Sequence, residues 1–268
     1  MGFDHWCRWP LGLAAILAGW SFAPERLLAA QPGEGIGVVV AARQVTGTLV
    51  TERRELAKDD PVFQDDVLET GGKGSGEFRL GDDTKLALGP GTRLTLDEFV
   101  YDADKGTPTL VVDLLEGSFR FVTGKLEHKA YKIRAGAATL GVRGTIFDVY
   151  ADAKNGVVVL LHEGAVEICN AAASCRSHVT IGRVIHVSAS GVVSAPLEWS
   201  DTIIPGIGLE RAFPFLSRRL AIDPVRRLGA VAIVARPIIG TGRKLVGKVG
   251  RSAGKLGRRA RRLIRSPF

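Results

Sequence analysis

Turn signals recur every 8–12 residues between Gly35 and Val193, and short runs of alternating apolar and polar residues lie between them. The alternation is clear at 77–80 and 85–88, which Gly81-Asp82-Asp83 separates, and again at 93–96. Glycine, with 33 of 268 residues, is also more frequent than in an average protein. This rhythm is typical of an all-β roll or sandwich built from consecutive hairpins, and it predicts one β domain over residues 35–195.

Two Glu-Gly pairs, at 116–117 and 163–164, lie between runs of β-type residues. We interpret both pairs as breaks between strands, and the first as a two-residue hairpin turn. A further turn is predicted at Lys154-Asn155-Gly156, where residues that tolerate positive φ separate two apolar runs. The sequence therefore predicts many short strands joined by tight turns.

The first 30 residues are similar to an export signal. Arg8 precedes an apolar run at 10–23, and the small residues Ala29-Ala30 follow it. The run is shorter than a confident membrane span, so it predicts a Sec-type signal peptide cleaved near Ala30 and a periplasmic protein. An uncleaved inner-membrane anchor, and a misassigned start or buried helix, are the alternatives. Cys7 precedes the apolar run, whereas a lipoprotein cysteine would follow it.

Removal of such a signal leaves an even pair of cysteines, Cys169 and Cys175. Five residues lie between them and β-type stretches flank them, which predicts a hairpin loop closed by a disulfide. An oxidising compartment would make that bond persistent. A zinc site would need four ligands, and His178 is the only further candidate nearby, so no metal or other cofactor is predicted.

Charge divides the chain into two parts. Residues 218–268 form a basic arm with a net charge of +14, whereas the rest of the chain has a net charge of −6. A linker is predicted at 196–217. On a helical wheel, one side of the arm gathers basic residues that could contact an anionic surface: Lys244, Lys248, Arg251, Lys255, Arg258, Arg259 and Arg262.

Apolar residues of the arm gather on another side of the same wheel, with four glycines between the two groups. Each glycine costs a helix about 1 kcal/mol relative to alanine, so the arm is expected to be largely unfolded in water. Two interpretations remain open: a disordered basic tail, or a helix that forms on phospholipid or lipopolysaccharide. Nucleic acid would attract the same charge, but an exported protein is not expected to meet it.

The sequence offers little that resembles a known catalytic site. It contains no H-E-x-x-H and no C-x-x-C, its G-x-S-x-G spacing at 250–254 lies within the basic arm, and the five histidines show no ligand spacing. His162-Glu163 is interpreted as a surface turn. The glycines at 70–76 lack the order of a phosphate-binding loop, so a flexible hairpin loop is expected there, with Lys73 exposed. We therefore predict no enzymatic activity.

Three pairs of acidic residues suggest calcium, because oxygen-rich loops suit a hard cation. The pairs are 59–60, 65–66 and 82–83, and none has the spacing of a known calcium loop, so solvated turns are expected. Arg143 lies between glycines and is expected to donate hydrogen bonds to loop carbonyls or to an acidic neighbour such as Asp148. Ligand capture by Arg143 is the alternative.

Five short motifs follow one another in a distinctive order. They are DVLETG at 66–71, GDDTKL at 81–86, LEGSFR at 115–120, VRGTIFDV at 142–149 and EGAV at 163–166. In this order and spacing, the stretch from Asp65 to Val166 resembles the FecR domain, named for a ferric-citrate regulator of bacterial envelopes. The signature of that family corresponds here to Gly141, Val142, Arg143, Gly144 and Thr145. The resemblance implies an all-β periplasmic module for sensing or protein contacts, without known catalytic chemistry.

The chain also departs from the family pattern. Members that act as anti-sigma regulators carry a cytoplasmic helical domain and a membrane span first, whereas about 34 residues precede the β region here. The basic arm stands in place of the usual C-terminal partner-binding subdomain. The resemblance therefore implies a stand-alone exported module for envelope sensing, signalling or scaffolding, and sigma-factor inhibition is not carried over.

The partner of such a module is unknown and could be an envelope protein or polymer. The alternative function is binding of cell-wall polysaccharide or peptidoglycan, with the basic arm docking the protein on the envelope. This alternative predicts exposed aromatic residues, Trp199 or Tyr101, gathered on one face. An unrecognised hydrolase would require a cleft that joins a nucleophile, a base and an orienting group.

Overall fold

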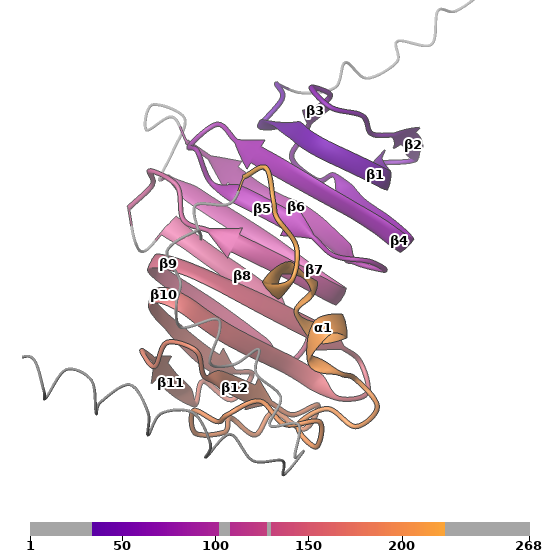
Figure 1. Ribbon diagram of the computed structural model, residues 1–268. Helices are drawn as coiled ribbons and strands as arrows, with labels where there is room; N and C mark the ends of the chain where they lie inside the picture. The colour runs from indigo at the N-terminus through magenta and orange to yellow at the C-terminus, as the bar shows by residue number, and fades with distance from the viewer. Residues whose placement is uncertain (1–33, 102–107, 128–129, 223–268) are drawn as a thin grey trace, which may run out of the picture. The chain divides into compact units, whose positions relative to one another are not determined.

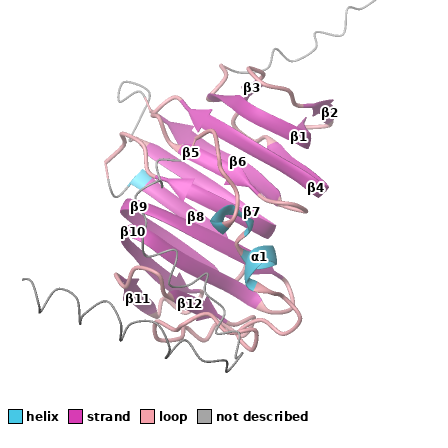
Figure 2. Ribbon diagram, viewed as in Figure 1, coloured by secondary structure: helices cyan, strands magenta, loops and turns pink. Residues whose placement is uncertain are grey.

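The computed structural model describes residues 34–101, 108–127 and 130–222 (Figure 1). In these residues the fold is all-β, as predicted, with a twelve-stranded sheet. A short helix, α1 (Leu209–Ala212), and a 3₁₀ turn, η3 (Pro214–Leu216), follow the strands (Figure 2). Neither is long enough to cross a membrane, and no other helix of the described residues qualifies.

The strands are, in chain order, β1 (Gly37–Leu49), β2 (Glu52–Glu55), β3 (Pro61–Val62), β4 (Val67–Leu80), β5 (Lys85–Leu88), β6 (Arg93–Val100), β7 (Thr109–Val122), β8 (Tyr131–Ala135), β9 (Ala138–Asp152), β10 (Gly156–Asn170), β11 (Cys175–His178) and β12 (Val184–Val187). The predicted turns at Gly81-Asp82-Asp83 and Lys154-Asn155-Gly156 join β4 to β5 and β9 to β10. All pairs are antiparallel except β7 with β8, which run parallel.

The five longest strands change partners midway along their length. The first part of β7 pairs with β6 and β8, and its part from Gly117 onward pairs with β5 and β9. Gly117 has a φ of 96°, and Gly144 in β9 and Gly164 in β10 have positive φ as well. A residue in this conformation can bend a strand without ending it. The Glu-Gly pairs at 116–117 and 163–164 are therefore bends inside β7 and β10, and their prediction as breaks between strands was wrong.

One hydrogen bond shows how far β7 bends. Tyr131 pairs with Leu110 at the start of β7, whereas Val122 at its end pairs with Lys85, close to Asp82. The Tyr131 hydroxyl nevertheless donates to the Asp82 carboxylate over 2.8 Å. The Phe121 ring, near the end of β7, also contacts the Tyr131 ring, so the second part of β7 turns back toward its start and the sheet folds over on itself, as expected for a roll or sandwich.

Large apolar side chains fill the space between the layers. Phe119, Phe121 and Phe147 are fully buried, and their rings contact one another with centroids 5.3–6.3 Å apart. Tyr131 adds an edge-to-face contact with Phe121. Full burial of each such ring contributes about 1.5–3 kcal/mol, so this aromatic cluster is a major part of the core.

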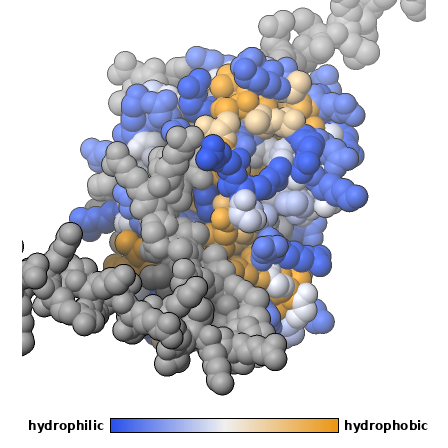
Figure 3. All heavy atoms as spheres, in the orientation of Figure 1, coloured by the Kyte–Doolittle hydropathy of each residue, from blue (hydrophilic) through white to orange (hydrophobic). Residues whose placement is uncertain are grey.

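Residues 199–222, here called the strap, cross the outer face of the layer that contains β5 and the second half of β7 (Figure 1). Its Phe213 and Phe215 are buried, and the apolar outer side chains Val158 and Leu160 of β10 pack with the strap. Hydrophobic side chains show between hydrophilic ones on the face seen in Figure 3.

The strap includes most of the residues that the sequence analysis assigned to a linker at 196–217 and the first residues of the basic arm. The structure instead packs these residues on the sheet, because the outer face beneath them is apolar. Polar contacts add to this packing. The Ser118 hydroxyl donates to the Arg211 carbonyl over 3.1 Å, and the Ile222 N–H donates to Glu77 over 3.0 Å.

Candidate functional site

The signature at 141–145 forms a corner where β9 and β10 bend together. A Cβ added at Gly164 would lie 2.1 Å from the Gly144 carbonyl oxygen, so the two strands approach too closely for any side chain there. The Thr145 hydroxyl donates to the Ala165 carbonyl over 2.8 Å, and the Thr145 N–H donates to the Thr123 hydroxyl over 2.8 Å. These residues hold the two layers at a fixed angle.

The remaining signature residues divide between the core and the surface. Val142 is buried in the core, whereas Gly141 and Arg143 are exposed. The Arg143 side chain makes no hydrogen bond or ion pair with another described residue; its backbone N–H donates to Thr145 Oγ1 over 3.2 Å. Asp148, which the sequence suggests as its acidic neighbour, is held by Arg120 instead.

Arg120, Asp148 and His162 form a buried ionic cluster beneath the strap. Arg120 Nε and Nη2 donate to the two oxygens of Asp148 over 2.6 and 2.9 Å. His162 Nε2 lies 2.9 Å from Asp148 Oδ2, and the Phe215 ring covers the guanidinium at 5.4 Å. The prediction of a surface turn at His162 was wrong, because β10 continues through this residue and buries it.

The cluster fixes the ionisation state of Asp148. Burial alone would raise the pKa of this carboxyl, but the charges of Arg120 and then His162 outweigh burial and bring the pKa down to about 2. Asp148 is therefore ionised at neutral pH. All three side chains are at most 2% exposed, so solvent reaches none of them freely.

Two of the acidic pairs also contribute buried carboxylates, contrary to the prediction of solvated turns. Asp66 accepts hydrogen bonds from Arg54 over 2.9 and 2.5 Å. Asp82 accepts from the hydroxyls of Thr84 over 2.6 Å and Tyr131 over 2.8 Å. Burial, with a smaller contribution from Asp82, raises the pKa of Tyr131 to about 12. These carboxylates join loops to strands.

Residues 71–76 continue β4 and do not form the predicted hairpin loop. Thr70 directly precedes this stretch, and its hydroxyl donates to the Gly89 carbonyl over 2.6 Å. A Cβ at Gly74 would lie 2.8 Å from the Gln44 carbonyl oxygen, so β1 and β4 pass closely here. Lys73 is exposed, as expected.

Cys169 and Cys175 form the predicted disulfide. They lie directly opposite each other on β10 and β11, and residues 171–174 form the connecting turn. Burial lowers the pKa of the neighbouring His178, whose Nε2 lies 3.0 Å from the Arg183 carbonyl oxygen.

The residues that the structure describes contain no group of three side chains that could hold a metal ion. The predicted signal at 1–30 and the seven basic residues of the arm lie outside the described residues.

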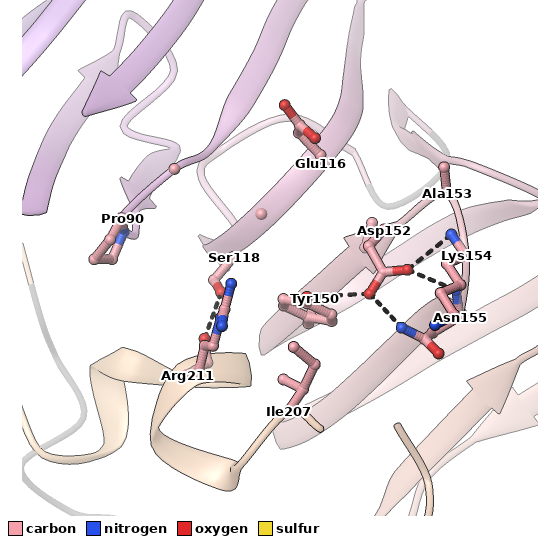
Figure 4. A pocket seen from close by; sticks show the side chains of 13 residues that line it. Pro90, Glu116, Ser118, Tyr150, Asp152, Ala153, Lys154, Asn155, Ile207 and Arg211 are labelled. Carbon is pink, nitrogen blue, oxygen red and sulfur yellow. Dashed lines mark hydrogen bonds between the residues drawn. The ribbon is translucent and has the colours of Figure 1, made fainter. Parts of the chain in front are cut away.

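A groove of about 490 Å³ lies where the β7 bend, the β9–β10 turn and α1 meet (Figure 4). The half of its lining that carries polar side chains is Glu116, Ser118, Tyr150, Asp152, Lys154, Asn155 and Arg211. No local pattern in the sequence predicted this groove, because its residues come from four separate segments.

Asp152 stabilises the part of the groove that the β9–β10 turn forms. One of its oxygens accepts hydrogen bonds from the backbone N–H groups of Lys154 over 2.9 Å and Asn155 over 2.6 Å. The other accepts from the Tyr150 hydroxyl over 3.1 Å and from the Asn155 amide over 2.8 Å. Burial would raise the pKa of Asp152, but these donors outweigh it and lower the pKa. Burial and then Asp152 raise the pKa of Tyr150 to about 12.

Three charged side chains at the groove are exposed: Glu116, Lys154 and Arg211. Within the described part of the chain, none of them forms a side-chain hydrogen bond or ion pair. Both Arg211 and Glu116 act on the Tyr150 hydroxyl electrostatically, with opposite signs, so both lie near it. The groove therefore presents both signs of charge to solvent.

Comparison with known protein families identifies the region of the chain that contains these motifs. Residues 66–167 match the family model described as FecR protein. These residues form a FecR domain. Among curated proteins, no sequence matches the chain.

Two crystal structures, at 1.65 and 2.50 Å resolution, share limited similarity with the chain; both are of a candidate anti-sigma factor from Parabacteroides distasonis ATCC 8503. The sequence identity is 21% and the TM-score 0.40. The similar region covers 48% of this chain and 57% of the other, so it spans little more than half of that protein.

In this FecR domain the motif residues have mainly structural roles. Asp66, Asp82, Arg120, Thr145 and Asp148 are all buried, and all bond to other residues of the domain. The groove, by contrast, includes Tyr150, Asp152, Lys154 and Asn155 of the matched region together with Ile207 and Arg211 of the strap, which lies outside it. The motifs therefore build the scaffold, and the strap completes the groove.

Proposed function

We propose that this chain is a non-enzymatic FecR-domain module of the periplasm that binds another envelope component and serves in sensing, signalling or scaffolding. The observation that carries this proposal is the groove, where Glu116, Lys154 and Arg211 are exposed and make no side-chain hydrogen bond or ion pair with another described residue. The buried polar residues of the family motifs, such as Asp66, Asp82 and Arg120, are already bonded within the domain and offer little to a ligand, whereas Arg143 is exposed.

The buried ionic cluster supports binding over catalysis. A carboxylate beside a histidine, as in Asp148 and His162, is an arrangement that enzymes use to activate a nucleophile. Here both side chains are at most 2% exposed, and Arg120 donates hydrogen bonds to the Asp148 carboxylate. No serine, threonine or cysteine of the described residues hydrogen-bonds to His162. A substrate would have to displace the strap to reach this cluster.

The disulfide supports the periplasmic location. Such a bond between Cys169 and Cys175 persists in an oxidising compartment and would be reduced in the cytosol. The signal-like segment at 1–30 agrees with export. We propose that the basic arm then attaches the domain to an anionic surface of the envelope.

Cell-wall polysaccharide binding is less well supported. Sugar binding commonly needs aromatic faces that a ligand can cover, and the sequence suggested Trp199 and Tyr101. The Trp199 ring packs edge-to-face on Phe213 of the strap, with centroids 5.4 Å apart, and Tyr101 stacks on Phe99. Both rings are thus partly occupied, and the groove is the better candidate.

Site-specific photo-crosslinking in intact cells tests the proposal. A photo-crosslinking amino acid at Ala153, which lines the groove, should give a defined adduct with an envelope component. The same amino acid at Val50, which is 90% exposed on the β1–β2 turn, is the matched control. Absence of an adduct at Ala153, or equal adducts at both positions, would contradict a binding role for the groove.

A further inference from the structure

We infer that the groove binds a short peptide that carries both a free ammonium and a free carboxylate group, with Glu116 contacting the ammonium and Arg211 contacting the carboxylate. This inference rests on the proposed binding function and names the class of ligand.

The first argument is the placement of the charges. Glu116, Lys154 and Arg211 lie on different sides of the Tyr150 ring in Figure 4, and all line the same groove. Arg211 and Glu116 oppose each other in their effect on the Tyr150 hydroxyl, so both act on the middle of the groove. A ligand seated over Tyr150 would therefore meet the negative Glu116 on one side and the positive Arg211 on another, whereas Lys154 lies beyond Asp152.

The second argument is the rigidity of the backbone that carries these side chains. Four hydrogen bonds to Asp152 hold the turn that bears Lys154. Glu116 precedes Gly117, where a Cβ would lie 2.5 Å from Thr92, so this bend is tightly packed. The Ser118 hydroxyl holds the carbonyl of Arg211. A preorganised backbone lowers the entropic cost of binding.

The third argument is electrostatic exclusion of other ligands. A purely anionic ligand would be repelled by Glu116 and Asp152, and a purely cationic one by Lys154 and Arg211. A neutral sugar would leave all of these charges without a partner. A zwitterion satisfies both sets at once, and charge-assisted hydrogen bonds are stronger than neutral ones.

The size and apolar lining of the groove set the length of the peptide. Its volume of about 490 Å³ is within the range of about 300–1,000 Å³ typical of small-molecule sites. Pro90 and Ile207 line the same groove and offer contacts to small apolar side chains. A peptide of two to three small residues fits this combination.

Titration of the full chain with the tripeptide Ala-Ala-Ala, followed by NMR, tests the inference. The matched probes are the same tripeptide with its amine acetylated and with its carboxylate amidated. The free tripeptide should shift the signals of Tyr150 and Gly117. Each modification should weaken binding about five- to tenfold, since each removes one charge-assisted contact.

Variants then assign each end of the peptide. In Glu116→Gln, acetylation of the peptide should make no further difference, and in Arg211→Gln amidation should make none. Lys132→Gln, a change of an exposed lysine on β8, is the control and should bind like the wild type. All these side chains are exposed, so thermal unfolding should be unchanged.

Absence of binding, or equal binding of free and blocked tripeptides, would overturn the inference. So would binding that Glu116→Gln and Arg211→Gln leave unchanged. An adduct at Ala153 in cells without tripeptide binding would overturn the ligand class and leave the proposed function standing. Failure of both experiments would overturn both.

Discussion

Arg120 on β7 lies directly opposite Asp148 on β9, and its guanidinium donates two hydrogen bonds, of 2.6 and 2.9 Å, to the carboxylate. Both residues lie in the region that matches the FecR family model, yet they face away from the aromatic core and lie beneath the strap. The pair therefore joins two strands of one layer and provides a charged surface on which Phe215 packs.

Arg120→Met should be strongly destabilising, because it leaves the buried Asp148 carboxylate without its main partner. We expect a loss of about 3–5 kcal/mol in the free energy of unfolding, measured by urea denaturation. Arg134→Met is the control: this arginine is 46% exposed and pairs with Asp113 and Asp97, so its loss should cost at most about 1 kcal/mol. Equal losses in the two variants would refute the assigned role.

The same pair predicts how stability depends on pH. The pKa of Asp148 is about 2 in the folded protein, below its ordinary value of 3.8. Its stabilising contribution is therefore complete above about pH 5 and is lost as the pH falls through about 4 to 2, a change of roughly 2 kcal/mol. Asp148→Asn should be less stable at neutral pH but should lose less stability over this acid range. An equally steep loss in both proteins would contradict this assignment.

The corner at Gly164 predicts a contrast between two glycine substitutions. Gly164 has a φ of 79° and no room for a Cβ, so Gly164→Ala should cost at least about 2 kcal/mol. Gly72 has no atom within 4 Å of an added Cβ, and Gly72→Ala should be nearly neutral. Thermal unfolding of the two variants measures the difference. A neutral Gly164→Ala would show that β9 and β10 do not meet as described.

The disulfide should resist alkylation until it is reduced. Replacement of both Cys169 and Cys175 by alanine should lower the free energy of unfolding by roughly 2 kcal/mol without unfolding the domain, because the closed loop is short. Mass spectrometry after alkylation and urea denaturation provide the two readouts. Free thiols in protein isolated from its native compartment would refute both the bond and the proposed periplasmic location.

The basic arm provides a prediction that depends on its sequence alone. A peptide of residues 238–268 should be unfolded in buffer and gain helix with anionic phospholipid vesicles, as measured by circular dichroism. Neutral vesicles are the control and should give less helix and weaker binding. Equal effects of both vesicles, or no gain of helix, would leave only the interpretation as a basic tail.

The alternation of residues predicted the all-β fold, and the cysteine spacing predicted the disulfide, because both depend on residues close in sequence. The bends could not be recognised in this way. A glycine with positive φ after Glu116 or Glu163 is compatible with a two-residue turn and with a bend inside a strand. Only the pairing of strands far apart in sequence distinguishes the two.

The partners of buried charges were equally hard to predict. Asp148 lies five residues after Arg143, but its partner is Arg120, which the register of β7 and β9 places opposite it. The sequence analysis assigned most of the strap to a linker, because the strands that its apolar side chains cover lie far away in the sequence. The groove requires both the strap and the bend, so no local pattern revealed it.

Hydrogen exchange tests the central claim, that this FecR-domain protein binds an envelope component through its groove. The component captured at Ala153 should be purified and added back to the full chain, and exchange should be measured by mass spectrometry. We predict protection at residues 150–155 and 207–211, which line the groove, and none at 52–55 on β2. Protection that excludes the groove would contradict the account.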